Sequence, residues 1–245
     1  EYLDYMSSCK SPQQMFGAIT KTFYAQEQNI NPADIVTVAV MPCSAKKFEC
    51  NRPEMTDSGF KDVDFGLTTR ELAQMIKEAG LNLPELPKSD FDEPFGEASG
   101  AGLIFGATGG VMEAALRTAS EWITGESVDK LEFTEVRAVE GLRESTVQIG
   151  DYTLNVAVAN GLINAKTILE RVISGEKQYH LIEIMACPGG CIGGGGQPYP
   201  PKGMKVLDPA LLRLRAKALY SIDENKQLRR SHENLMITQL YEDFL

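Results

Sequence analysis

One run of the sequence constrains the fold more than any other, residues 183–198, which read EIMACPGGCIGGGGQP. Two thiols, Cys187 and Cys191, lie there in backbone that carries almost no side chains. Their i, i+4 spacing would place both sulfurs on one side of a helical turn, and the glycines permit positive φ and close approach to a ligand. Thiolates among bare backbone N–H groups suit an iron–sulfur cluster, whose sulfurs need hydrogen-bond donors.

Glycine runs also occur in flexible loops and in phosphate cradles, although neither uses two cysteines at this spacing. An apolar segment, 179–186, precedes the run and is predicted to be a strand. A nucleotide site therefore stays open as an alternative. Against it, the two thiols and Pro188 interrupt any dinucleotide-binding fingerprint.

A second thiol follows another apolar segment, 34–43, which is predicted to be a strand that delivers Cys43 at its carboxyl end. Its apolar residues run without alternation, as in a parallel strand that is covered on both faces. Lys46, Lys47 and Glu49 come next, which places charge beside a thiol at the sheet edge where open α/β folds keep their sites. Such a lysine can stabilise a thiolate or donate to an anion. The alternative is a surface lysine pair beside a structural cysteine.

These two segments carry a specific resemblance. Residues 41–49, MPCSAKKFE, and 183–198 are similar to the second and third signature motifs of the FeFe hydrogenases, also called iron-only hydrogenases. Residues 7–17, 68–72, 99–115 and 230–234 resemble the same catalytic domain in the same order. The resemblance implies that 1–245 is a partial catalytic domain of that large subunit. The implied fold class is α/β, with mixed and parallel sheets flanked by helices in a two-lobed domain.

The resemblance also implies a cofactor, the H-cluster, in which a 4Fe-4S cluster joins a two-iron subsite with carbonyl, cyanide and dithiolate ligands. By motif match, Cys43, Cys187 and Cys191 are three of its four cysteine ligands, and Cys191 is the bridging one. Lys46 matches the lysine that donates to an iron cyanide. A charge-assisted bond of this kind is strong in a dry pocket.

Five further residues match groups around that cofactor. Met41, Met185 and Phe105 match side chains that pack around the two-iron subsite, Gln13 matches a polar neighbour, and Ser7 matches a hydroxyl in the proton path to solvent. Ordinary core packing is an equally valid interpretation of the two methionines and the phenylalanine.

The sequence departs from the family pattern on its N-terminal side. The first signature, Thr-Ser-Cys-Cys-Pro, should precede Ser7 and does not occur. The fourth cluster ligand and the cysteine that passes protons to the two-iron subsite belong to that signature. The accessory cluster domains and the usual C-terminal tail are likewise not in the sequence. We therefore expect a fragment of a longer protein, with little or no hydrogen turnover by itself.

The implied activity is the interconversion of protons and electrons with dihydrogen in an anaerobic, cytoplasmic setting. Electrons would come from ferredoxin, or from NAD(P)H through partner subunits. One alternative is a sensory or cluster-assembly relative of the same fold that keeps the cubane and lacks the two-iron subsite. Another is a scaffold whose cysteines are merely buried.

Composition excludes several other classes. A net charge of −10 disfavours a nucleic-acid surface, and no apolar run approaches the roughly 20 residues that a membrane span needs. Five cysteines in a chain of this size do not suggest a disulfide framework. Neither a zinc-protease motif nor a serine nucleophile elbow occurs. The basic run 213–217 is predicted to be a solvated helix face, and His180 and His232 to be structural or surface residues.

Outside the matched ligands, Cys9 is predicted to be buried beside the active-site segment and Cys50 to be incidental. Local patterns predict helices at 11–25 (capped by Ser11), 70–79 (capped by Thr69), 111–118, 163–174, 208–220 and from 231 onward. Strands are predicted to end at 41 and at 185 and to occupy 63–67, Val136, 144–149 and 152–159, with a hairpin turn at Gly150–Asp151.

Two other segments carry specific expectations. Residues 80–100, rich in acids and prolines, are predicted to be a surface excursion and not a domain linker, and 44–66 to be mostly loop. The glycine-rich turn 106–110 precedes a helix start, which favours an anion. Close packing explains these glycines equally well.

Overall fold

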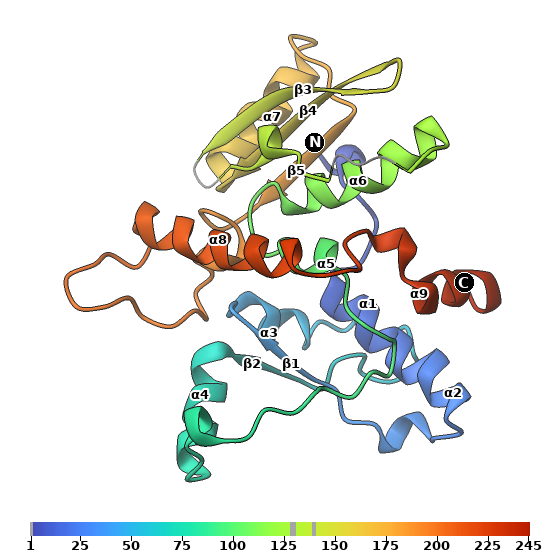
Figure 1. The fold of residues 1–245 in the computed structure, drawn as a ribbon, viewed down its shortest axis with the longest axis vertical. Helices are drawn as coiled ribbons and strands as arrows, with labels where there is room; N and C mark the ends of the chain where they lie inside the picture. Colours follow the sequence, from blue (N-terminus) through green and yellow to red (C-terminus); the bar gives the residue numbers. More distant parts are fainter. Residues whose placement is uncertain (1, 128–130, 139–140) are drawn as a thin grey trace. The chain divides into compact units, whose positions relative to one another are not determined.

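The computed structural model describes residues 2–127, 131–138 and 141–245. Two compact units divide the chain: unit 1 comprises Glu1–Pro94 and Gly195–Pro198, and unit 2 comprises Phe95–Gly194 and Tyr199–Leu245 (Figure 1). The first boundary between the units, after Pro94, falls inside residues 80–100. The prediction that this segment is not a domain linker is therefore wrong. Apart from a short 3-10 turn, η4 (Leu83–Glu85), it is mostly exposed coil up to residue 94, as expected where few contacts cross between compact units.

Unit 1 begins with a short turn, η1 (Leu3–Tyr5), and the predicted helix. The Ser11 hydroxyl caps α1 (Pro12–Ile19), with proline at its first position. The helix continues through one π-turn, η2 (Thr20–Tyr24), into α2 (Ala25–Glu27). The predicted helix is therefore confirmed, and it extends slightly further than expected.

The sheet of unit 1 pairs β1 (Val38–Met41) in parallel with β2 (Phe65–Thr68), after a turn at η3 (Pro32–Asp34). The expectation of a strand covered on both faces is wrong, because Val38 is 51% exposed and Val40 is 42% exposed. Both valines therefore retain much of their accessible surface.

Two helices flank this sheet. The short helix α3 (Ala45–Glu49) follows β1 directly, within a stretch predicted to be mostly loop. The helix α4 (Thr69–Glu78) follows β2 and begins one residue earlier than predicted. Its N-cap is Thr68 and not Thr69, because Thr68 and Glu71 form a reciprocal capping box.

Two aspartates anchor the loop before β2. The side chain of Asp62 is fully buried and accepts hydrogen bonds from Ser58 and Lys10. Burial alone would raise its pKa, but these bonds outweigh that effect and hold the pKa below its usual value of 3.8. Burial would also raise the pKa of Asp64, but Lys21 helps to hold that pKa below its usual value.

Unit 1 is expected to lose stability in acid. A depressed pKa means that the folded chain binds the proton less tightly than the unfolded chain. Both carboxylates therefore stabilise the fold above their unfolded pKa of about 4, and this contribution is lost as the pH falls through the lower folded pKa. In urea titrations between about pH 5 and pH 2.5, Asp62→Asn should show a shallower loss of stability than the parent. Asp90→Asn, at an exposed position, should match the parent; equal slopes for all three chains would contradict this account.

Unit 2 contains a three-stranded sheet in the order β3-β4-β5 (Figure 1). The strands β3 (Leu142–Ile149) and β4 (Tyr152–Asn160) form the predicted hairpin around Gly150 and Asp151. The helix α7 (Leu162–Ile173) then leads to β5 (Leu181–Met185), which pairs with β4 in parallel. Mixed parallel and antiparallel sheets flanked by helices confirm the predicted α/β class.

The residues of β4 alternate between the two faces of this sheet. Val156 and Val158 pack with Met112 and Leu116 of the helix α6 (Gly110–Thr124), while Ala157 and Ala159 pack against α7. The predicted strand at Val136 is wrong. Val136 lies in a 3-10 turn, η5 (Thr134–Val136), and is apolar because it is fully buried in the first of these clusters.

Three more helices complete unit 2: α5 (Gly100–Ile104), α8 (Pro209–Glu224) and α9 (Leu235–Asp243). Residues of α5 and α8 share one apolar cluster, whose members are Ile104, Ala107, Ile192, Leu212, Ala216 and Tyr220. A short turn, η7 (Ser231–Glu233), precedes α9, so the last helix starts four residues later than predicted. No helix in the described ranges combines the length and apolar character that crossing a membrane requires.

Candidate functional site

The cysteine-glycine segment leaves β5 as a turn and not as a helix. Gly189 and Gly190 have φ of +75° and +90°, and Cys191 opens a 3-10 turn, η6 (Cys191–Gly193). The prediction that the two cysteines share a helical turn is therefore wrong. They lie at the two ends of a glycine turn, Cys187 partly exposed and Cys191 exposed.

The backbone amides of this segment mostly hold the loop together. The amides of Gly190, Gly193 and Gly194 donate to carbonyls of the loop, and Gly196 donates to Pro42 within unit 1. The expected nest of bare N–H groups is thus wrong for these positions. A glycine-rich turn satisfies its own polar groups where no side chain can do so.

The turn is also fixed to the neighbouring loop 106–110. The amide of Thr108 donates to Gly189 over 3.0 Å, and the amide of Ile192 donates to Gly106 over 3.0 Å. A Cβ on Gly190 would lie 2.8 Å from the backbone nitrogen of Thr108. Close packing of two backbones therefore requires glycine at this position.

Sequence reasoning missed Glu183, a buried carboxylate at the start of the motif. Its oxygens accept hydrogen bonds from the amides of Gly109, at 2.6 Å, and Met112, at 2.7 Å, at the N-terminus of α6. Burial raises its pKa, and the amides partly oppose that effect. The anion at this glycine-rich helix start is therefore the protein's own carboxylate. A glutamate inside an apolar strand was the available signal.

Arg215 was also missed as part of the site. It lies in the run 213–217, predicted to be a solvated face, yet its guanidinium donates to the carbonyl of Ile192 over 2.8 Å. Burial lowers the pKa of Arg215. The prediction holds for Arg213 and Lys217, which are exposed, and is wrong for Arg215.

Two predicted neighbours of the cofactor lie in unit 2. Met185 ends β5 and is half-buried. Phe105 is half-buried and lines an apolar groove of about 360 Å³ together with Val111 and Trp122 of α6. Both side chains therefore retain accessible surface.

Cys43 follows β1 in unit 1, partly exposed, with Met41 also half-buried. The end of the glycine motif packs closely against it. A Cβ on Gly196 would lie 2.6 Å from the backbone nitrogen of Cys43, and Arg70 donates to the carbonyl of Gln197 over 2.5 Å. The second and third motif segments therefore meet within unit 1.

Lys46 and Gln13 are brought together by the carboxylate of Glu49. The Lys46 ammonium lies 2.9 Å from a carboxylate oxygen of Glu49, which also accepts from Ser11 and from the Gln13 amide. Glu49 thus holds both predicted residues and the cap of α1. The Oε1 atom of Gln13 is buried and accepts no hydrogen bond among the described residues, a property compatible with a nearby donor group.

Of the two cysteines outside the predicted ligand set, the prediction that Cys9 is buried is wrong. Cys9 is exposed, whereas Cys50 is 2% exposed and accepts from the Gln13 amide. Burial raises the pKa of the Cys50 thiol. Ser7 is exposed, and its hydroxyl accepts from the Cys9 amide over 3.2 Å.

The histidines lie away from these motifs. His180 is exposed and contacts the amide of Asn155, while His232 is partly buried against Glu121 and Thr118. Within each unit, the described residues bring no three His, Cys, Asp or Glu side chains together around one point. Cys43 belongs to unit 1, and Cys187 and Cys191 to unit 2.

The donor chemistry of these residues fits an iron–sulfur cofactor. Thiolates are its usual ligands, and the sulfurs need accessible positions on rigid backbone. Cys187 and Cys191 lie at the ends of a turn that the loop 106–110 holds in place. The backbone of Cys43 packs closely against Gly196.

The comparisons with known proteins identify the family. The profile of the iron-only hydrogenase large subunit, C-terminal domain, matches residues 1–195, and that of the iron hydrogenase small subunit matches residues 209–245. The chain belongs to the iron-only hydrogenase large-subunit family.

Individual relatives agree with this assignment. The NADP-reducing hydrogenase subunit HndD of Solidesulfovibrio fructosivorans is 51% identical over 245 residues, which are 100% of this chain and 41% of that protein. The cytosolic Fe-S cluster assembly factor narfl of Xenopus tropicalis is 34% identical over 99% of this chain and 51% of its own length. This chain thus spans about half or less of these relatives.

A solved structure confirms the fold. A variant of apo FeFe hydrogenase HydA1 from Chlamydomonas reinhardtii superposes with a TM-score of 0.79 at 41% identity, covering 100% of this chain and 67% of that one. The predicted family resemblance and fold class are therefore both confirmed.

Proposed function

We propose that this chain forms the part of an FeFe hydrogenase that holds the H-cluster, and that the full-length protein interconverts protons and electrons with dihydrogen. The observation that carries the proposal is the presentation of Cys187 and Cys191 at the two ends of a glycine turn that two backbone hydrogen bonds tie to residues 106–110. Rigid thiolates at accessible positions are what a cluster requires.

Cys43, Cys187 and Cys191 would hold the 4Fe-4S cluster, with Cys191 bridging to the two-iron subsite. The bound group supplies the redox and hydrogen-activating chemistry, and the protein supplies binding, orientation and electrostatics. Met41, Met185 and Phe105 would exclude water from it. Ser7, an exposed hydroxyl, would pass protons to solvent.

Lys46 would orient the two-iron subsite through a charge-assisted hydrogen bond. In the structure, Glu49 holds the Lys46 ammonium at 2.9 Å, and Gln13 shares that carboxylate. A long flexible lysine that is already paired loses less rotamer freedom when it donates to a ligand.

We further propose that electrons reach the full-length protein from ferredoxin, or from NAD(P)H through partner subunits, in the cytoplasm of an anaerobe. The name of the 51% identical relative, an NADP-reducing hydrogenase subunit, favours the second route. The sequence contains three of the four expected ligand cysteines. The 245-residue chain should therefore have little or no hydrogen turnover alone.

A second candidate is a cluster-assembly protein of the same fold. The 34% identical Xenopus relative, a cluster assembly factor, favours it. Such a protein would keep the cubane without the two-iron subsite, so Lys46 and Met185 would have no ligand to contact.

A chimera tests the proposed function. This chain should replace the matched span in a full-length hydrogenase relative, expressed anaerobically with its maturation proteins, and dihydrogen evolution from reduced viologen should be measured. We expect turnover, and we expect Lys46→Met to lower it by about 10²–10³-fold. Lys47→Met is the matched control, because Lys47 lies on the same helix and pairs with Glu71. A chimera that carries iron and sulfide but evolves no dihydrogen would favour the second candidate.

A further inference from the structure

The turn that carries Cys187 and Cys191, residues 187–193, continues directly from β5. Glu183 lies within this strand, four residues before Cys187, and is only 7% exposed. Glutamates mostly lie at the surface, because burying a carboxylate costs free energy unless partners compensate. The proposed cluster ligands and the groups around them do not include Glu183. Its burial therefore needs an explanation of its own.

The carboxylate of Glu183 binds the start of α6, which lies beside β5 (Figure 1). One oxygen accepts from the Gly109 amide at 2.6 Å, and the other accepts from the Met112 amide at 2.7 Å. The Val111 amide also favours the charged form of the carboxylate. The first amides of a helix have no partners within the helix, so an anion at this place satisfies them.

The start of α6 is continuous with loop 106–110, and this loop binds the cysteine turn. The Thr108 amide donates to the Gly189 carbonyl, and the Ile192 amide donates to the Gly106 carbonyl, both over 3.0 Å. Gly189 lies between the two cysteines, and Ile192 directly follows the second. The placement of both thiols therefore depends on where the loop is held.

Close backbone contacts keep the loop from moving independently of its surroundings. Gly109 has φ +92°, and a Cβ there would lie 2.2 Å from the carbonyl oxygen of Val136. The Ala138 amide donates to the Thr108 carbonyl over 3.2 Å. A displacement at the start of α6 would therefore be passed on to the cysteine turn.

These contacts form a closed series within unit 2. The strand β5 leads into the cysteine turn, the turn bonds to loop 106–110, and the loop continues into α6, whose amides donate to Glu183 back in β5. The links between the turn and the loop are backbone hydrogen bonds. The link between α6 and β5 is made by the side chain of Glu183, so a single substitution can open the series.

We propose that Glu183 is a positioning residue, whose carboxylate fixes the start of α6 to β5 and thereby holds the turn that presents Cys187 and Cys191. The mechanical part of this inference concerns the chain alone. The part that concerns a bound cluster rests on the proposed function. The two parts are tested separately.

Hydrogen exchange of the 245-residue chain without added iron tests the mechanical part. Glu183→Gln keeps the shape of the side chain but turns one acceptor oxygen into an amide donor, which would face the N–H of Gly109 or Met112. The protection of the Thr108 and Ile192 amides should fall at least about 10-fold, because a hydrogen bond to a charged group is lost. Amides of the β3–β4 hairpin should keep their protection within about 2-fold.

Two further variants sharpen this experiment. Glu144→Gln, at an exposed carboxylate of β3 in the same sheet, is the matched control and should leave both amides as protected as in the parent. Glu183→Asp keeps the charge but shortens the reach, so it should also lower their protection, and it decides the question where the glutamine variant does not fold. Unchanged protection at Thr108 and Ile192 in either variant, or an equal loss throughout unit 2, would overturn the proposal.

Electron paramagnetic resonance (EPR) of the anaerobically reconstituted chain tests the placement of the thiols. The spectrum of the reduced 4Fe-4S cluster should change in both Glu183 variants, because cluster properties depend on ligand placement and nearby charge. The midpoint potential should shift to more positive values in Glu183→Gln, which removes a negative charge, and less in Glu183→Asp. A parent-like spectrum in both variants would overturn the proposal. A parent chain that takes up no cluster would contradict the proposed function instead, and hydrogen exchange would then decide the role of Glu183.

Discussion

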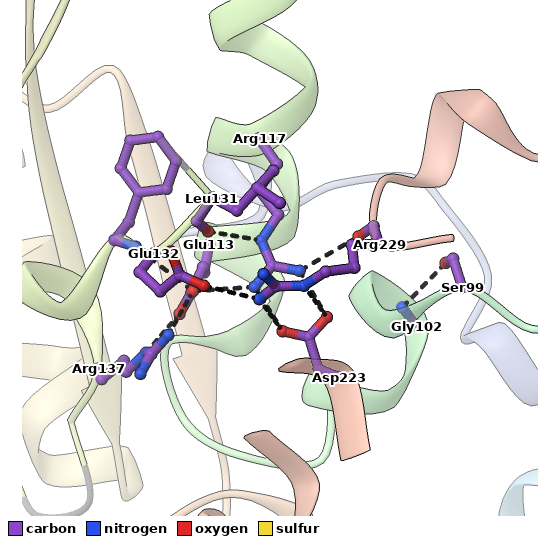
Figure 2. A network of polar contacts seen from close by, with 10 residues as sticks. Ser99, Gly102, Glu113, Arg117, Leu131, Glu132, Arg137, Asp223 and Arg229 are labelled. Carbon is purple, nitrogen blue, oxygen red and sulfur yellow. Dashed lines mark hydrogen bonds and ion pairs between the residues drawn. The ribbon is translucent and has the colours of Figure 1, made fainter. Parts of the chain in front are cut away.

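Replacement of Arg117 by methionine is expected to lower the free energy of unfolding by about 3–5 kcal/mol. Arg117 is 1% exposed, and its guanidinium pairs with both Glu113 and Asp223 (Figure 2). Methionine fills a similar volume but leaves two carboxylates buried with fewer donors. Breaking a buried pair from one side is costly because the remaining charge is not compensated.

Urea unfolding followed by circular dichroism measures this loss. Lys217→Met, at an exposed position on α8, is the matched control and should change stability by less than about 0.5 kcal/mol. The double variant Arg117→Met with Asp223→Asn should be less destabilised than the sum of the two single variants, since the residues act as a pair. A loss within about 1 kcal/mol for Arg117→Met would show that solvent reaches the network.

Gly190→Ala is the second change with a large expected effect, about 2–4 kcal/mol of stability. Gly190 adopts φ +90° and ψ −154°, a region that side chains disfavour. An added Cβ would also lie 2.8 Å from the Thr108 nitrogen and 3.0 Å from the Gly106 carbonyl oxygen. Both contacts are backbone, so the turn that carries Cys187 and Cys191 would have to move.

Gly203→Ala separates these two causes. Gly203 has φ +92°, yet nothing lies within 4 Å of an added Cβ. This control should cost only about 1–2 kcal/mol, from backbone conformation alone. If thermal and urea unfolding give equal losses for the two variants, the close packing of the cysteine turn on 106–110 does not contribute to stability.

Local signals in the sequence predicted much of the fold. The helix start at Ser11 and Pro12 and the hairpin turn at Gly150 and Asp151 each depend on two neighbouring residues. The structure confirms both. The end of the strand at Met185 is likewise confirmed. Boundaries that depend on competition between neighbours were less predictable, as with the cap at Thr68, where Glu71 three residues on decides the choice.

Long-range contacts could not be predicted from the sequence. Glu183 lies 74 residues from Gly109, from whose amide it accepts a hydrogen bond, and its place inside an apolar strand does not reveal that partner. Arg215 similarly resembles its exposed neighbours until the Ile192 carbonyl is placed beside it. The burial of Cys50 likewise depends on a long-range contact, because Gln13 of α1 donates to its sulfur.

Sequence motifs predicted the residues of the candidate site, but they did not predict the contacts among those residues. Matching named Cys43, Cys187 and Cys191, and the structure supplies the rigid backbone that presents each of them. It also supplies Glu49, which links Lys46 with Gln13. The ligand roles of the three cysteines remain a proposal that depends on both units.

The most direct test is the iron and acid-labile sulfide content of the 245-residue chain after anaerobic reconstitution. The proposal predicts roughly four of each per chain, with the broad visible absorption of a 4Fe-4S cluster. Serine at Cys43, Cys187 or Cys191 should abolish most of this loading, whereas Cys9→Ser, at an exposed cysteine outside the set, should leave it unchanged. Iron and sulfide loading that survives the triple serine variant would contradict the proposed site.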